Sequence, residues 1–111
     1  MRTLVMHYGC TGCHTISIFP EAGGTLAPDL SHIGSDAAQV IFSAGYKASS
    51  GQATTGSAYI RESIPEPGRF VAADCPTGPC LPHLMPPTFQ QQFKSAPADL
   101  ELIIKLLTSL N

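Results

Sequence analysis

Cys10-Thr11-Gly12-Cys13-His14 carries the most specific chemistry in this sequence. Two cysteines separated by two residues and followed at once by a histidine form the pattern of covalent haem attachment, in which each thiol adds to a vinyl group of the porphyrin. The imidazole of His14 then lies beside the iron and can serve as its proximal ligand, which leaves the sixth position for another residue. The pattern therefore predicts one haem c, attached through Cys10 and Cys13.

Short cysteine patterns also occur in thiol redox motifs and in zinc sites. The histidine directly after the second cysteine favours haem attachment over both. A zinc site completed by the two remaining cysteines, Cys75 and Cys80, is disfavoured because they lie much farther along the chain than the usual ribbon spacing allows. A purified protein without covalent haem would support the zinc interpretation.

Length and composition indicate a single small domain, residues 1–111, with little apolar material of its own to bury. Because the residues before the motif leave no room for a secretory signal, we expect this domain to be a piece of a longer exported or membrane-anchored chain. The chain contains 10 Gly and 10 Pro and lacks Trp, which predicts many turns and few long elements. A buried haem would supply the missing hydrophobic mass. We therefore expect the haem-free chain to be largely unfolded, because a ligand bound only by the native state stabilises that state.

The charge pattern excludes several classes of partner. The formal net charge is −2 at pH 7 with His neutral, and the six Lys and Arg residues are scattered along the chain. The sequence therefore has no cluster of basic residues that would bind nucleic acid or an anionic membrane surface, and it has no lysine-rich docking face. No run of 18 apolar residues occurs, so we expect no membrane span in this chain.

From residue 9 to residue 110 the chain resembles the class I, monohaem c-type cytochromes of bacteria. The attachment motif carries the resemblance together with three other segments, which are residues 27–34, residues 59–64 followed by Pro67, and the Met-Pro sequence at Met85. The resemblance implies an all-α cytochrome c fold, with about four short helices and long loops wrapped around one haem.

The resemblance also implies how the proximal side of the haem is built. In the family a proline carbonyl accepts the Nδ1 proton of the proximal histidine, and a following leucine packs on the ring; Pro28 and Leu30 match these two positions. Such a bond fixes the imidazole and raises its basicity as a ligand. Tyr59 and Ile64 match the mid-chain helix that walls the pocket, and both suit an ordinary core position equally well.

Met85 is the sixth ligand that the resemblance implies, because the family presents a methionine from a proline-bracketed loop and two prolines follow this residue. A thioether paired with an imidazole is a known axial set of cytochromes c. The prolines restrict φ, which lowers the entropy lost in holding a weak ligand. His83 is the rival ligand, and its use would give a bis-histidine centre.

Cys75 and Cys80 enclose the turn sequence Pro-Thr-Gly-Pro. The resemblance implies that haem is attached outside the cytoplasm, as it is in bacteria. In that compartment we expect Cys75 and Cys80 to close a small disulfide loop rather than to remain two free thiols. Short loops gain least in the chain-entropy account, so the stabilisation should be modest. We therefore expect a periplasmic or otherwise extracytoplasmic location.

Hydrophobic spacing predicts the helices, and the clearest is residues 97–110. Its apolar positions at i, i+3, i+4 and i+7 are Leu100, Ile103, Ile104 and Leu107. Shorter helices are predicted at residues 3–8, 35–42 and 57–64. Residues 45–56 are small and polar, which predicts a surface loop.

The function that the resemblance implies is one-electron transfer rather than enzymatic catalysis. The partners would be redox proteins, such as a membrane respiratory or photosynthetic complex, and the chain could be a domain or subunit of an oxidoreductase complex. The alternative is a haem c domain with labile or bis-histidine ligation, which would act in ligand sensing or as an electron-entry domain. Carbon monoxide discriminates between them, because prompt binding to the ferrous protein would indicate an open iron.

Overall fold

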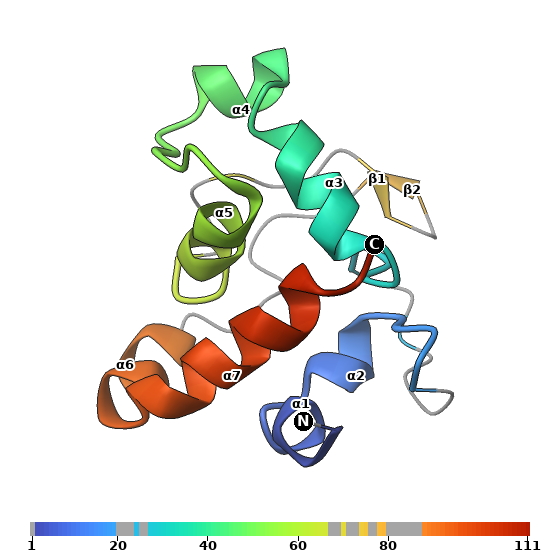
Figure 1. The fold of residues 1–111 in the computed structure, drawn as a ribbon, viewed down its shortest axis with the longest axis vertical. Helices are drawn as coiled ribbons and strands as arrows, with labels where there is room; N and C mark the ends of the chain where they lie inside the picture. The colour runs from blue at the N-terminus through green and yellow to red at the C-terminus, as the bar shows by residue number, and fades with distance from the viewer. Residues whose placement is uncertain are drawn as a thin grey trace.

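The structure is a computed structural model, and it describes residues 2–19, 24, 27–66, 70, 74–75, 78–79 and 88–111. These residues are mostly helical, as expected, and the only strands among them are two residues long (Figure 1). The helices are α1 (Arg2–His7), α2 (Cys10–Cys13), α3 (Ile33–Val40), α4 (Ala44–Ala48), α5 (Gly56–Ser63), α6 (Phe89–Ser95) and α7 (Pro97–Thr108). The strands β1 (Asp74–Cys75) and β2 (Gly78–Pro79) pair antiparallel, with Asp74 opposite Pro79.

Helix α7 is the element against which most of the others pack. It contacts α1, α3, α5 and α6, and α3 and α5 also pack on each other. Figure 1 shows α7 crossing the molecule between α1 and α2 on one side and α3 and α5 on the other. Ile103 and Leu107 of α7 also line the candidate site.

The sequence of α7 explains why it forms and which face it buries. Pro97 occupies the first turn, Asp99 lies near the positive end of the helix dipole and Lys105 lies near the negative end. Ile103, Ile104 and Leu107 are buried, which confirms the predicted apolar stripe. The helix ends at Thr108, two residues before the predicted end.

The predicted helices at 3–8, 35–42 and 57–64 are present as α1, α3 and α5, with ends shifted by one or two residues. Helix α5 begins after Thr55, whose side-chain oxygen accepts a hydrogen bond from the backbone N–H of Ala58 at 3.1 Å. Helix α3 begins two residues early, at Ile33, and no side chain caps it.

The expected number of about four helices is wrong for the described residues, because several short helices interrupt the expected loops. Helix α4 overlaps the start of the predicted surface loop 45–56; Ser43 caps it and Tyr46 anchors it. The Tyr46 hydroxyl donates to Glu62 Oε1 at 2.6 Å and accepts from the N–H of Ala53 at 2.8 Å, and its side chain is only 3% exposed. One buried aromatic therefore orders a segment whose composition is typical of a loop.

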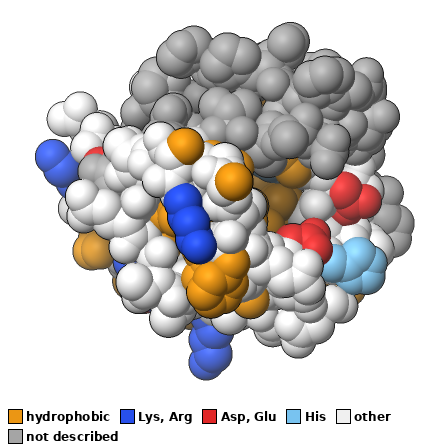
Figure 2. All heavy atoms as spheres, turned by 90° about the horizontal axis from the view of Figure 1, so that it is seen from above, with side chains coloured by type: hydrophobic (Ala, Val, Ile, Leu, Met, Phe, Trp, Pro, Cys, Tyr) orange, Lys and Arg blue, Asp and Glu red, His pale blue; other side chains and the backbone are white. Residues whose placement is uncertain are grey.

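Within the described residues no helix is long and apolar enough to cross a membrane. Figure 2 looks down on the α4 end of the molecule, and the Lys and Arg side chains visible there stand apart from one another. Their separation in space agrees with their scattered positions along the sequence.

Two neighbouring residues of α7 test whether the buried face of this helix stabilises the fold. Ile103 is 1% exposed and Leu102 is 44% exposed. We expect Ile103→Ala to lower the free energy of unfolding by about 2–5 kcal/mol, because it leaves a cavity in the core. Leu102→Ala, the matched control, should change it by no more than about 0.5 kcal/mol. Equal losses for the two variants in chemical denaturation would contradict this orientation of α7.

Candidate haem-binding site

A glycine sets the direction of the attachment motif. Gly9 follows the end of α1 and adopts φ 76°, in the left-handed region that glycine tolerates best. The chain then turns into α2, which spans Cys10–Cys13 and places the two thiols one helical turn apart. His14 is already extended, and its N–H donates to the carbonyl of Cys10 at 3.0 Å.

The side chain of His14 is held by the partner that the sequence predicted. Its Nδ1 lies 2.7 Å from the carbonyl oxygen of Pro28. Since a carbonyl can only accept, Nδ1 carries the proton and Nε2 keeps its lone pair. Burial lowers the pKa of His14, and the bond to Pro28 acts in the opposite direction. The imidazole is therefore neutral at neutral pH, with a defined tautomer and a free Nε2.

The loop that supplies Pro28 is tied to the attachment motif through backbone bonds. The N–H of Ala27 donates to Cys13 O at 3.1 Å, and the N–H of Leu30 donates to Thr15 O at 2.8 Å. Thr15 Oγ1 donates to Gly24 O at 2.8 Å. A Cβ at Gly24 would overlap the backbone of Cys13, so only glycine allows this close approach. These contacts fix the position of the Pro28 carbonyl relative to His14.

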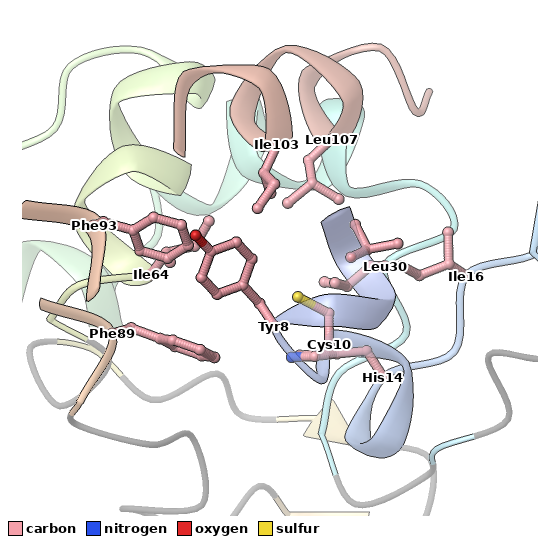
Figure 3. A pocket seen from close by; sticks show the side chains of 11 residues that line it. Tyr8, Cys10, His14, Ile16, Leu30, Ile64, Phe89, Phe93, Ile103 and Leu107 are labelled. Carbon is pink, nitrogen blue, oxygen red and sulfur yellow. The ribbon is translucent and has the colours of Figure 1, made fainter. Parts of the chain in front are cut away.

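Cys10 and His14 border an apolar hollow whose cavity volume is about 40 Å³. Its lining comes from α1, α2, α5, α6, α7 and the segment after His14, and it consists of Val5, Tyr8, Cys10, His14, Ile16, Leu30, Ile64, Phe89, Phe93, Ile103 and Leu107. In Figure 3, Cys10 and His14 lie next to each other across the hollow from Phe89 and Phe93.

The lining fits a haem. A porphyrin requires apolar walls, one or two thiols at its edge and an axial ligand at its face, and it supplies four of the metal's ligands itself. The hollow offers aliphatic and aromatic side chains, the Cys10 thiol and the His14 imidazole. Within the described residues no group of three or more His, Cys, Asp or Glu side chains gathers to hold a bare metal ion.

The structure brings together most of the predicted proximal residues. Leu30 and Ile64 line the hollow with Cys10 and His14. Cys13 is half-buried in α2 and is not part of the lining. Among the described side chains, Cys10 and Cys13 are both free thiols, and burial raises the pKa of Cys10.

Tyr59 does not line the hollow. It lies five residues before Ile64, which places the two side chains on different faces of one helix. Its ring is buried in edge contacts with Tyr46 at 5.5 Å and with Phe70 at 6.2 Å. Tyr59 therefore occupies the ordinary core position that was its alternative interpretation.

The distal half of the predicted site lies outside the described residues. Met85, its rival His83 and Cys80 all fall in the stretch 80–87. Of Cys75 only the backbone is described, in β1, so the predicted disulfide also lies outside what the structure describes.

Three aromatic residues of the lining were not predicted as site residues. The ring of Tyr8 packs on Phe93 at 4.6 Å and meets the edge of Phe89 at 6.3 Å, and the Tyr8 hydroxyl donates to Asp99 Oδ2 at 2.8 Å. Phe89 and Phe93 are four residues apart, which is the spacing of one helix face, and this signal could have found α6.

Comparison of the chain with protein-family models, with curated proteins and with solved structures finds no match. The interpretation of the hollow therefore depends on its own residues and their geometry.

Proposed function

We propose that the chain is a one-electron carrier with a cytochrome c fold, in which one haem c is attached through Cys10 and Cys13 and lies in the hollow. The observation that carries this proposal is the His14–Pro28 hydrogen bond of 2.7 Å beside an apolar hollow that also receives the Cys10 thiol. The haem, when bound, supplies a metal that gains and loses one electron.

His14 is the proximal ligand in this proposal. Its Nδ1–H is donated to Pro28, which selects the tautomer with a lone pair on Nε2 and holds the ring in one orientation. The same bond makes the imidazole a stronger donor to a metal. The loop that carries Pro28 is hydrogen-bonded to the backbone of Cys13 and Thr15. These bonds hold the Pro28 carbonyl in place beside His14.

The remaining lining keeps water from the cofactor. Leu30, Ile64, Ile103 and Leu107 present only carbon atoms to the hollow, and low polarity is one of the factors that set a haem potential. Met85 is proposed as the sixth ligand. If His14 and Met85 both held the iron, no position would remain for a substrate and little would have to rearrange on electron transfer.

The proposed partners are redox proteins, such as a membrane respiratory or photosynthetic complex, on the extracytoplasmic side of the membrane. That location suits the proposed Cys75–Cys80 disulfide, because such bonds persist in oxidising compartments. The scattered basic residues favour recognition by shape and apolar contact over long-range steering by positive charge.

Intact mass and a visible spectrum in both redox states test the proposal. We expect a mass increase equal to one haem, retained under denaturing conditions, and no prompt reaction of the ferrous protein with carbon monoxide. An unmodified mass would contradict the proposal. Covalent haem together with prompt carbon monoxide binding would support the alternative of a ligand sensor.

A methionine pair tests the sixth ligand. We expect Met85→Ala to abolish the weak absorption band that sulfur ligation gives to ferric haem, and to open the ferrous iron to carbon monoxide. Met6→Ala is the matched control, because Met6 is 50% exposed in α1 and does not line the hollow. If Met85→Ala keeps the band while His83→Ala changes the spectrum, the ligand assignment moves to His83.

A further inference from the structure

A carboxylate is hydrogen-bonded to the wall of the hollow. Tyr8 lines the hollow, and its hydroxyl donates to Asp99 Oδ2 at 2.8 Å across 91 residues of sequence. Asp99 lies in the first turn of α7 and is half-buried. The bond joins the helix before the attachment motif to the central helix of the fold.

Asp99 brings a negative charge to a hollow whose described lining is uncharged. Among the residues that the structure describes, none of those lining the hollow is Asp, Glu, Lys or Arg. Arg61 and Glu101 are paired with each other at 2.6 Å on the exposed surface, so together they contribute little net charge. The pKa of Tyr8 is raised, first by the bond to Asp99, then by burial and by the negative charge of that carboxylate. The phenol therefore keeps its proton and remains a donor that holds the carboxylate in place.

We propose that Asp99, held against the wall by Tyr8, lowers the reduction potential of the haem in this hollow. This inference rests on the proposed function. The carboxylate acts by its charge and Tyr8 acts as a positioning residue. Neither touches the iron.

The physical cause is the change in charge when the site accepts one electron. The oxidised site carries one more positive charge than the reduced site, so a fixed negative charge nearby stabilises the oxidised form. The apolar lining screens this interaction less than water would. The backbone dipoles at the positive end of α7 favour the reduced form, and the negative charge of Asp99 offsets them. Only the electron moves, and no proton transfer is needed.

The test is the midpoint potential of purified haem-loaded variants. We expect Asp99→Asn to raise the ratio of reduced to oxidised protein at a fixed solution potential by about three- to tenfold. This ratio corresponds to an upward shift of the midpoint potential by about 30–60 mV. Asp36→Asn is the matched control, because Asp36 occupies the first turn of α3 in the same way but is exposed and does not line the hollow. It should shift the ratio less than twofold.

Tyr8→Phe tests the positioning of Asp99 separately from its charge. It keeps the ring that packs on Phe93 and removes the donor, so the carboxylate can turn toward water. We expect a smaller upward shift than for Asp99→Asn, and we expect the effect of Asp99→Asn to shrink when Tyr8→Phe is already present. Thermal unfolding of the same variants distinguishes this from a purely structural tie, which would lower stability and leave the potential unchanged.

Two results would overturn the inference, and they differ in what else they affect. If the protein carries haem and Asp99→Asn shifts the potential no more than Asp36→Asn, the inference fails while the proposed function stands. If the wild-type protein carries no covalent haem, both fail together.

Discussion

Replacing Cys10 and Cys13 together by serine is expected to give a protein without haem and without a cooperative thermal transition. In the proposed function both attachment points are lost, and we expect a haem held only by its ligands to leave during purification. The remaining chain must then close the apolar hollow without the group that would fill it. A haem bound only by the native state would stabilise that state, so its loss would remove that contribution entirely. Far-UV circular dichroism, visible absorption and intact mass measure the outcome.

Thr11→Ser is the control for this experiment, because Thr11 lies between the two cysteines in α2 and its change leaves both thiols in place. It should retain the haem mass and the wild-type spectrum. Each single variant, Cys10→Ser or Cys13→Ser, should keep one covalent link and lose only part of the stability. A cooperative transition in the haem-free double variant would show that the fold does not depend on the cofactor.

Gly34→Ala is expected to destabilise the protein by about 3 kcal/mol, and this holds whatever the hollow binds. Gly34 is the second residue of α3, and its N–H donates to the carbonyl of Leu110 at 2.6 Å. A Cβ there would lie 2.7 Å from Leu110 O and would also overlap Thr108 O. These are backbone atoms, so no side-chain rotation relieves the overlap. Chemical denaturation measures the loss.

Gly45→Ala is the control for this close approach, because Gly45 is the second residue of α4 and, among the described residues, its Cβ would meet Phe70 alone, at an ordinary 3.6 Å. Alanine favours helix over glycine by about 1 kcal/mol, so this variant should be neutral or slightly stabilised. If Gly34→Ala behaves like Gly45→Ala, the ends of α3 and α7 do not approach as closely as the structure has them.

Local signals in the sequence were sufficient for several parts of this molecule. The apolar period of residues 97–110 predicted the buried face of α7, because that face depends only on helical spacing. The resemblance of residues 27–34 to the corresponding segment of the cytochrome family predicted Pro28 as the partner of His14, and the structure has this hydrogen bond. Helix α4 was missed, since the small polar residues around Tyr46 are typical of loops and only its buried ring orders them.

The sequence by itself determined the helical class and, through the family resemblance, the hydrogen-bond partner of His14; its prediction of covalent haem attachment belongs to the proposed function. The tertiary structure alone decided which side chains meet at the hollow. Tyr8 reaches Asp99 and Phe93, and Gly34 meets Leu110, across most of the chain length. Such contacts depend on how the helices pack around α7, and no local pattern encodes the register of two helices that are so far apart in sequence.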